Sequence, residues 1–506
     1  MRLTELARLA GARLIGDGEV EITTIEQDSR VAGQGSLFVA VPGFTVDGHA
    51  YIARAIESGA QAVAVQEDRE ALWRPLVEGG GADILVMPDT RGGLAELAAA
   101  LYGYPARRLK VIGVTGTDGK TSLCHLVAHV LNSTGHKAGL ISTAECRIGD
   151  ELLPDTGRFT TPEAPAVQEM LARMVEAGCE WAVIEATSHG LALHRVDGCE
   201  YDIAALTNIG RDHIDFHGTH EEYREAKARL FEMLDESVDK GVQKTAVINA
   251  DDATETFFRG HTKARVITYA IGASSDVRGV DITADARGSW VRADAAGERI
   301  EFRVPHPGQF NAYNGLAAIA VAAAAGVGPE AAGRAIESWP GAPGRMEMID
   351  EGQPFTVVVD FAHSSESLRR VLEHLRETVR GRIITVFGCI GERDKERRSG
   401  MAAAAAELAD YTIVTDDNPY SEDRRTIIEA IAAGLRAAGK REGHDFAVAP
   451  DRREAIAQAL AMAVDEDAVL LAGKGHERTV HLGDVEYPCH DPTVAREVLR
   501  RIIAGR

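Results

Sequence analysis

The segment from residue 110 to residue 135 constrains the fold of this chain more than any other. It opens with the apolar run V-I-G-V, passes through the turn T-G-T-D-G-K-T and ends in the helix-like run S-L-C-H-L-V-A-H-V-L-N-S-T-G. A strand, a glycine-rich turn and a helix in this order begin a phosphate-binding α/β domain. We therefore expect a mostly parallel sheet with helices on its faces.

The turn also has the residues that bind a nucleoside triphosphate. Glycines let backbone N–H groups approach a phosphate, and the N-terminus of the next helix adds a positive dipole end. Lys120 is expected to reach the β- and γ-phosphates, and Thr121 to hold Mg²⁺. An ordinary P-loop kinase or GTPase is disfavoured, because strict P-loop spacing requires glycine where Val114 stands and no N-K-x-D string is present. The predicted ATP-binding residues here are Gly116, Thr117, Asp118, Gly119, Lys120, Thr121 and Ser122.

Short apolar runs followed by polar loops recur along the rest of the chain, which is typical of further α/β domains. At about 150 residues per domain, the 506 residues correspond to three domains. We place the domains at residues 1–106, 107–341 and 342–506, with a Rossmann-like arrangement in the last. In the first domain, residues 51–65 are predicted to form a helix.

Charge and cysteine content narrow the possible partners. The chain has 55 Lys and Arg against 77 Asp and Glu, a formal net charge of −22, and this field repels nucleic acid and anionic membranes. The six cysteines form no C-x-x-C pair, which favours a reducing compartment over a disulfide framework or a zinc site. The sequence has no secretion signal and no apolar run long enough to span a bilayer. We expect a cytoplasmic protein with no nucleic-acid partner and no membrane insertion.

The T-G-T-D-G-K-T string resembles the nucleotide loop of the Mur ligase family, which usually has asparagine in place of Asp118. Glu185 ends an apolar strand, His213 lies in a polar loop, and Lys227 follows in a charged helix. Taken alone, each has an ordinary structural explanation, as a strand-end cap, a hydrogen-bonded histidine and a helix ion-pair partner. Together they match the family, which implies that Glu185 and His213 bind Mg²⁺ and that Lys227 is carbamylated. The resemblance makes Lys120, Glu185, His213 and Lys227 the predicted catalytic residues, and Thr121 a further metal ligand.

Further segments resemble the ATP-contacting parts of the same family. An asparagine amide can read an adenine edge, an arginine can clamp a phosphate, and an aspartate can accept ribose hydroxyls. Helix capping alone is an alternative explanation for the two asparagines. The residues matched in this way are Asn311, Asn314, Arg345, Asp360 and His363.

The first domain resembles the uridine-nucleotide-binding domain of MurE-type family members, which add the third residue of the stem peptide. The matching strings are Q-D-S-R, S-L-F-V-A and D-G-H-A-Y-I, and T-T-P and S-H-G-L-A-L-H-R extend the match to the groove for UDP-MurNAc-dipeptide. Leu193 departs from the family, which commonly has glutamine there. Folylpolyglutamate synthetases share the ATP machinery but do not need this first domain. The residues implied to bind UDP-MurNAc-dipeptide are Ser29, Arg30, Thr160, Thr161, Thr187 and Arg195.

The third domain resembles the amino-acid-binding domain of these enzymes. Members specific for meso-diaminopimelate have the string D-N-P-R, whose arginine clamps the distal carboxylate, whereas this chain has Tyr420 in that place. A phenol offers one hydrogen bond and no charge, a loss of about 2–3 kcal/mol. We therefore expect a basic L-amino acid such as lysine or ornithine, with meso-diaminopimelate remaining open. The implied amino-acid-binding residues are Arg398, Asp417, Asn418, Tyr420, Gly473 and Glu477.

The resemblance implies an ATP-dependent ligase. It phosphorylates the D-Glu carboxylate of UDP-MurNAc-L-Ala-D-Glu, and a free amino acid then attacks the acyl phosphate to form an amide. Catalysis of this kind consists mostly of positioning and charge neutralisation. A nucleotide-binding scaffold without catalysis is the alternative that the departures at Asp118, Leu193 and Tyr420 leave open. We expect a monomer.

Overall fold

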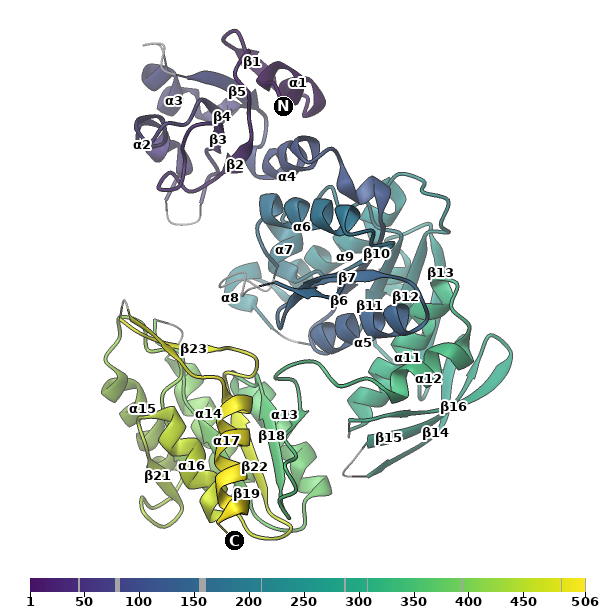
Figure 1. The fold of residues 1–506 in the computed structure, drawn as a ribbon, viewed down its shortest axis with the longest axis vertical. Coiled ribbons are helices and arrows are strands. Elements are labelled where there is room, and N and C mark those ends of the chain that lie inside the picture. The colour runs from purple at the N-terminus through teal and green to yellow at the C-terminus, as the bar shows by residue number, and fades with distance from the viewer. Residues whose placement is uncertain are drawn as a thin grey trace. The chain divides into compact units, whose positions relative to one another are not determined.

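The computed structural model describes residues 1–43, 46–77, 82–153, 161–210, 212–285, 288–306, 308–392, 395–483 and 485–505. The chain folds into two compact units, which are considered separately (Figure 1). The first unit comprises Met1–Asp281, Val291–Phe302 and Tyr313–Glu337. The second unit comprises Ile282–Trp290, Arg303–Ala312 and Ser338–Arg506.

The first unit begins with a five-stranded sheet of order β1-β5-β4-β3-β2, in which only β1 is antiparallel to its neighbour. The predicted helix over residues 51–65 is wrong in its second half, because Gly59 adopts φ 107° after α2 and the chain then enters β4. The strands are β1 (Arg13–Ile15), β2 (Thr24–Glu26), β3 (Ser36–Val39), β4 (Ala62–Gln66) and β5 (Asp83–Met87). The helices are α1 (Leu3–Leu9), η1 (Gly48–Tyr51), α2 (Ile52–Glu57), η2 (Glu67–Arg69), α3 (Glu70–Val77), α4 (Thr90–Leu101) and η3 (Pro105–Arg108).

An eleven-stranded sheet follows, in the order β16-β15-β14-β13-β12-β11-β6-β10-β7-β8-β9. Its middle, from β14 to β7, is parallel, as predicted for a phosphate-binding domain. The strands are β6 (Lys110–Thr115), β7 (Ala138–Ile141), β8 (Cys146–Ile148), β9 (Glu151–Leu152), β10 (Trp181–Glu185), β11 (Ile203–Leu206), β12 (Thr245–Asn249), β13 (Arg265–Ala270), β14 (Val277–Asp285), β15 (Gly288–Ala295) and β16 (Glu298–Val304). The helices are α5 (Lys120–Ser133), α6 (Ala164–Glu176), α7 (Ser188–Ala192), α8 (Ile214–His217), α9 (His220–Glu236), α10 (Glu255–Arg259), α11 (Gln309–Ala324) and α12 (Pro329–Glu337).

The second unit contains a six-stranded sheet of order β17-β18-β22-β19-β20-β21, parallel except for β17, and a separate hairpin of β23 and β24. The strands are β17 (Glu347–Met348), β18 (Thr356–Asp360), β19 (Ile383–Phe387), β20 (Tyr411–Val414), β21 (Phe446–Val448), β22 (Ala468–Ala472), β23 (Thr479–Leu482) and β24 (Val485–Pro488). The helices are α13 (Ser365–Thr378), α14 (Glu396–Leu408), α15 (Arg424–Ala437), α16 (Arg452–Met462) and α17 (Asp491–Ala504).

The central strands of both parallel sheets are buried on both faces, which explains their continuous apolar runs. In such sheets, ligands bind beyond the carboxyl ends of the strands, where the loops gather. All six cysteines are buried and free. Among the helices of the described ranges, none is both long and apolar enough to cross a membrane.

Candidate nucleotide and amino-acid sites

The predicted phosphate loop joins β6 to α5 in a conformation that requires glycine. Gly116 has φ 142°, and a β-carbon there would overlap Thr207 Oγ1. Gly119 has φ 81° and directly precedes α5. Thr117 N donates to Asn208 O at 2.7 Å, so the β11–α8 loop supports the phosphate loop from outside. The backbone is therefore held open at the N-terminus of α5, as phosphate binding requires.

The side chains of this loop are held by neighbours that the sequence did not indicate. Thr207 Oγ1 donates to Asp118 O at 2.6 Å, and Thr117 Oγ1 lies 2.8 Å from Tyr223 OH. Lys120 Nζ donates to Thr117 O at 2.8 Å, which folds the ammonium over the loop. Ser122 occupies the first turn of α5. The seven predicted residues thus form one continuous site.

Glu185 ends β10 as a buried carboxylate beside this loop, with 2% of its surface exposed. Thr121 Oγ1 donates to its two oxygens at 3.0 and 3.1 Å. Thr143 donates to Oε2 from its backbone N at 2.9 Å and from Oγ1 at 3.0 Å. The predicted pair of Thr121 and Glu185 is therefore in contact, and Thr143 is an additional member that no motif indicated.

Lys227 lies on α9, whose start is fixed by a capping box of Thr219 and Glu222. Its side chain is buried, and Nζ donates to Gly116 O at 2.6 Å, directly under the phosphate loop. Burial, together with the charge of Lys120, holds the pKa of the Lys227 ammonium well below its usual range. A deprotonated amine is the form that reacts with CO₂, so this environment fits the predicted carbamate.

His213 is more open than the other predicted metal ligands. It adopts φ 52° just before α8, and its side chain is 47% exposed, 3.3 Å from Asp212. Its ring lies 4.6 Å from the ring of His189, and burial together with the charges of Lys120 and Lys227 lowers its pKa despite Asp212. Within the described ranges, no three His, Cys, Asp or Glu side chains form a metal centre on their own. The oxygen donors of Thr121 and Glu185 nevertheless suit Mg²⁺, which retains several waters.

The two predicted asparagines lie on α11, and both are buried. A β-carbon at Gly119 would lie 2.9 Å from Asn314 Oδ1, so this amide faces the phosphate loop. Tyr313 OH, next to it in sequence, donates to Asp251 Oδ2 at 2.8 Å. Asn311 lies one turn earlier on the same helix.

The remaining predicted ATP-contacting residues form a cluster in the second unit. Asp360 ends β18 and accepts hydrogen bonds from the backbone N of Met346 at 2.7 Å and of Ala362 at 2.8 Å. The Arg345 guanidinium lies 4.6 Å from the centre of the Phe361 ring. His363 Nδ1 lies 3.0 Å from Phe361 O, and burial lowers the pKa of this histidine to about 4.

Ser29 and Arg30 line a pocket of about 430 Å³ in the N-terminal part of the first unit. Arg30 is exposed and forms a fork with Asp28, with Nε 2.9 Å from Oδ1 and Nη2 2.6 Å from Oδ2. Tyr51 and Arg54 complete the rim. An aromatic ring and two guanidinium groups suit an anionic nucleotide.

Three other residues predicted to bind UDP-MurNAc-dipeptide lie next to Glu185. Thr161 Oγ1 donates to Glu185 O at 3.0 Å and lies 2.9 Å from Thr187 Oγ1, which caps α7. Arg195 is buried, and its Nη1 donates to Thr161 O at 3.3 Å. These groups therefore adjoin the predicted metal site. Thr160 lies outside the described residues.

Four of the six predicted amino-acid-binding residues meet in the second unit, around a lysine that the sequence did not indicate. Lys474 is fully buried, and its Nζ donates to Glu477 Oε2 at 2.7 Å and to Asn418 Oδ1 at 3.2 Å. Asp417 is 1% exposed, and within the described ranges neither of its carboxylate oxygens accepts a hydrogen bond. Lys474 Nζ lies 3.8 Å from Asp417 Oδ1 as an ion-pair partner. A β-carbon at Gly473 would lie 3.0 Å from Asp417 Oδ2, so a larger residue would crowd this carboxylate.

The other two residues lie close by but have intramolecular partners. Arg398 is buried, and its two terminal nitrogens donate to the two oxygens of Glu422 at 2.8 and 2.7 Å. Tyr420 adopts φ 53°, and its ring stacks on His481 with centroids 5.4 Å apart. His481 Nε2 lies 3.9 Å from Glu486 Oε1. The position that carries arginine in D-N-P-R sequences thus holds an aromatic stack.

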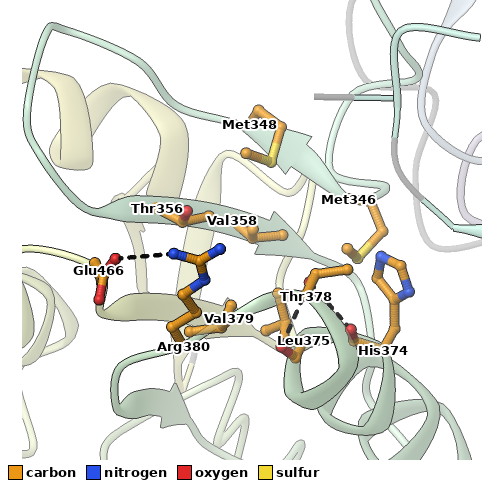
Figure 2. A pocket seen from close by; sticks show the side chains of 10 residues that line it. All are labelled: Met346, Met348, Thr356, Val358, His374, Leu375, Thr378, Val379, Arg380 and Glu466. Carbon is orange, nitrogen blue, oxygen red and sulfur yellow. Dashed lines mark hydrogen bonds and ion pairs between the residues drawn. The ribbon is translucent and has the colours of Figure 1, made fainter. Parts of the chain in front are cut away.

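A further pocket of about 360 Å³ lies in the second unit and contains none of the predicted residues (Figure 2). Strands β17 and β18 and the C-terminal end of α13 form its walls. Arg380 and Glu466 form an ion pair across its edge at 3.7 Å. Its lining is Met346, Met348, Thr356, Val358, His374, Leu375, Thr378, Val379, Arg380 and Glu466.

Comparison with known proteins identifies the family. The sequence matches the family models described as Mur ligase family, catalytic domain, over residues 21–102, Mur ligase middle domain over residues 114–322, and Mur ligase, glutamate ligase domain, over residues 344–475. A relative from Roseiflexus sp. (strain RS-1), named UDP-N-acetylmuramyl-tripeptide synthetase, is 43% identical over 493 residues, 96% of either chain. A relative from Geobacillus thermodenitrificans (strain NG80-2), named UDP-N-acetylmuramoyl-L-alanyl-D-glutamate--2,6-diaminopimelate ligase, is 40% identical over 497 residues, 98% of this chain and 99% of that one. A solved structure of a UDP-N-acetylmuramoyl-L-alanyl-D-glutamate--2,6-diaminopimelate ligase has a TM-score of 0.67 at 29% identity and covers 99% of this chain and 100% of its own.

The chain therefore belongs to the Mur ligase family. Members of this family are ATP-dependent ligases that form amide bonds, and this chain is such a ligase. The predicted architecture of three α/β domains and the resemblance to MurE-type members are both confirmed.

Proposed function

We propose that this ligase joins a free amino acid to the D-Glu carboxylate of UDP-MurNAc-L-Ala-D-Glu, in the cytoplasmic synthesis of peptidoglycan precursors. Relatives that match nearly the whole chain have names describing this activity. The structural observation that carries the proposal is the Asp417 carboxylate, which is buried and accepts no hydrogen bond from the described residues. Burial of a carboxylate that accepts no hydrogen bond is unfavourable even with the Lys474 ammonium 3.8 Å away, and the cationic amino group of an incoming amino acid supplies the missing donor.

ATP is bound by the loop between β6 and α5. Lys120, now bonded to Thr117 O, turns to the β- and γ-phosphates, and the backbone amides at the start of α5 surround them. The D-Glu carboxylate oxygen attacks the γ-phosphorus, ADP leaves, and an acyl phosphate forms. The amine of the amino acid then attacks the carbonyl carbon, loses a proton and expels phosphate. We assign the remaining contacts to ATP to the residues predicted for them, which are Asn311, Asn314, Arg345, Asp360 and His363.

Mg²⁺ fits the donor set formed by Thr121, Glu185, His213 and a carbamate on Lys227. When bound there, it neutralises phosphate charge during phosphoryl transfer. The neutral Nζ of Lys227 attacks the carbon of CO₂ and loses a proton, which converts a buried amine into an anionic ligand. Burial of Lys227 beneath Gly116 supports this step, because a charged ammonium is disfavoured there.

Three groups of residues are assigned to the uridine nucleotide, the dipeptide and the incoming amino acid. Ser29 and Arg30 hold the uridine nucleotide in the pocket of about 430 Å³, and Thr160, Thr161, Thr187 and Arg195 hold the dipeptide. In the second unit, Asp417, Asn418, Gly473 and Glu477 surround the amino group of the amino acid. Arg398 receives its α-carboxylate in exchange for Glu422.

We propose L-lysine or L-ornithine as the amino acid, with meso-diaminopimelate as the second candidate. Two carboxylates lie near Tyr420, because Ser421 N donates to Glu392 at 3.0 Å and Glu486 lies 3.9 Å from His481. These carboxylates favour a cationic side-chain end over one that carries an additional carboxylate.

Phosphate release from ATP tests the proposal. The assay contains UDP-MurNAc-L-Ala-D-Glu and Mg²⁺, with lysine, ornithine or meso-diaminopimelate in separate reactions. Release that depends on lysine or ornithine is the expected result, and release with meso-diaminopimelate alone would correct the identity of the amino acid. Release only with a folate and glutamate would replace the proposal with the folylpolyglutamate alternative, and no release with any substrate would favour the scaffold.

Replacement of Lys120 by alanine tests the phosphate loop. We expect Lys120→Ala to reduce phosphate release by at least 10³-fold, because the variant lacks the ammonium that lies over the phosphate loop and that the proposal assigns to the β- and γ-phosphates. Isothermal titration with UDP-MurNAc-L-Ala-D-Glu should give a Kd within threefold of the parent. Lys137→Ala, which removes the same charge at the opposite, amino end of β7, is the matched control. Turnover retained in Lys120→Ala would contradict the mechanism.

A further inference from the structure

A fully buried ion pair lies beneath the predicted amino-acid site, and no motif or predicted role includes it. Arg452 is the first residue of α16 and Asp491 the first residue of α17, and their side chains are 1% and 0% exposed. Arg452 Nε donates to Asp491 Oδ1 at 2.8 Å, and Nη2 donates to Oδ2 at 2.5 Å. The two helices pack against each other in the second unit (Figure 1).

The remaining hydrogen bonds of Arg452 connect this pair to the amino-acid site. Nη1 donates to Asp416 O at 3.1 Å, and Nη2 donates to Ala472 O at 2.9 Å. Asp416 directly precedes Asp417, and Ala472, the last residue of β22, directly precedes Gly473. One guanidinium therefore fixes the backbone at the carboxyl ends of two strands, at the two points where the predicted site begins.

The segment before Arg452 holds the same loop from a second direction. Asp416 N donates to Pro450 O at 3.3 Å, and Thr415 Oγ1 also reaches Pro450 O at 3.3 Å. The close approach of Gly473 to Asp417 leaves little room for either strand end to move. The position of the Asp417 carboxylate thus depends on backbone segments that are hydrogen-bonded to the Arg452 side chain and to the Pro450 carbonyl.

We propose that Arg452, oriented by Asp491, is a positioning residue for the amino-acid site, which keeps Asp417 and Gly473 in register for the incoming amine. This inference rests on the proposed function. A rigid planar fork is required, because three acceptors on different segments are bonded simultaneously. Lysine in place of Arg452 retains the charge opposite Asp491 but has its donors on a single nitrogen, which cannot occupy the positions of both Nη1 and Nη2.

Steady-state kinetics of two variants test the inference. We expect Arg452→Lys to raise the KM for the amino acid at least tenfold and to leave the KM for ATP and for UDP-MurNAc-L-Ala-D-Glu within twofold of the parent. The double variant Arg452→Met/Asp491→Leu removes both charges without leaving either one unpaired, and the same selective rise in KM is expected. Thermal melting and circular dichroism establish that each variant is folded.

The matched control is Arg382→Lys, which changes another arginine–aspartate pair of the same sheet. Arg382 Nη2 donates to Asp467 at 2.7 Å at the amino ends of β19 and β22, opposite the amino-acid site. We expect reduced thermal stability in this control with all three KM values unchanged. Unchanged KM for the amino acid in folded, active Arg452→Lys would overturn the inference, whereas the absence of amino-acid-dependent phosphate release in the parent enzyme would overturn the proposed function instead.

Discussion

At the scale of single residues, the predicted sites depend in part on side chains that were not predicted as site residues. Glu185 is held by Thr121 and Thr143, and the amino-acid site is organised around Lys474. Each partner replaces water around a buried charge, which would otherwise be costly. The motif residues define the chemistry, and these neighbours define the geometry.

Tyr420 is the residue at which the amino-acid preference is most directly tested. We expect Tyr420→Arg to shift the ratio of kcat/KM for meso-diaminopimelate over lysine by about one to two decades, because a guanidinium adds a charged fork for the distal carboxylate. The left-handed backbone at this position, φ 53°, is already adopted by a residue other than glycine. Competition assays with the two amino acids measure the ratio.

The control for this experiment is Tyr420→Phe, which retains the stack on His481 and removes only the hydroxyl. Its preference ratio should remain within threefold of the parent. If Tyr420→Arg also leaves the ratio unchanged, position 420 does not select the amino acid in this chain.

At the scale of elements, a capping box stabilises the N-terminus of α9, the helix that carries Lys227. Thr219 Oγ1 accepts from Glu222 N at 3.1 Å, and Glu222 Oε2 accepts from Thr219 N at 3.0 Å. We expect Thr219→Ala to lower the free energy of unfolding of the first unit by about 1 kcal/mol, because the backbone N of Glu222 loses its side-chain acceptor. Chemical denaturation followed by circular dichroism measures the change.

Thr256→Ala is the comparison for this variant, because Thr256 is exposed within α10 and, among the described residues, its hydroxyl donates only to its neighbour Glu255. Its effect should remain within about 0.5 kcal/mol. Equal losses in the two variants would show that the capping box does not stabilise α9.

The elements that the sequence predicted best are those whose local pattern and environment agree. The strand β6 is buried along most of its length and has a continuous apolar run, and most residues of the helix α5 between Leu123 and Leu131 are buried. Strands β13–β16 are not among the predicted elements, because exposed and buried residues alternate in β15 and β16 and give no continuous run. The end of α2 was missed because it depends on the positive φ of Gly59.

The parts of the sites that are contiguous in sequence were predicted, and the parts formed by distant residues were not. The phosphate loop is a local string, so its seven residues are contiguous. Lys474 contacts Asn418 from 56 residues away, and Thr143 contacts Glu185 from 42 residues away. A lysine between two glycines and a threonine in a loop are typical of solvated turns. Only the tertiary fold reveals these two residues as buried partners.

At the scale of the whole molecule, the buried side chain of His306 contributes to the change of stability with pH. His306 is 6% exposed, its ring lies 4.9 Å from the Trp339 ring, and burial, with Arg303 nearby, lowers its pKa to about 4. The unfolded chain then binds a proton more readily than the folded chain. This contribution to stability is complete above about pH 6.5 and is lost as the pH falls towards 4.

We expect the difference in unfolding free energy between the parent and His306→Gln to decrease by about 2 kcal/mol between pH 7 and pH 5. Denaturant titrations at the two pH values measure it. His444→Gln, at a position with 67% of the side chain exposed, serves as the control and should show no comparable change. A difference for His306→Gln that is independent of pH would mean that folding does not change the pKa of this histidine.

The attachment of the β23–β24 hairpin has an evolutionary consequence. Tyr420 N donates to His481 O at 3.1 Å and Gly483 N donates to Tyr420 O at 2.7 Å, so the hairpin and the loop are joined through main-chain atoms. Main-chain bonds do not depend on the side chains attached to them. Substitutions at positions 420 and 481 can therefore accumulate during evolution while the main-chain hydrogen bonds between the hairpin and the loop are kept. Under the proposed function, the amino acid that the ligase accepts can therefore change by substitution at these positions while the hairpin stays attached.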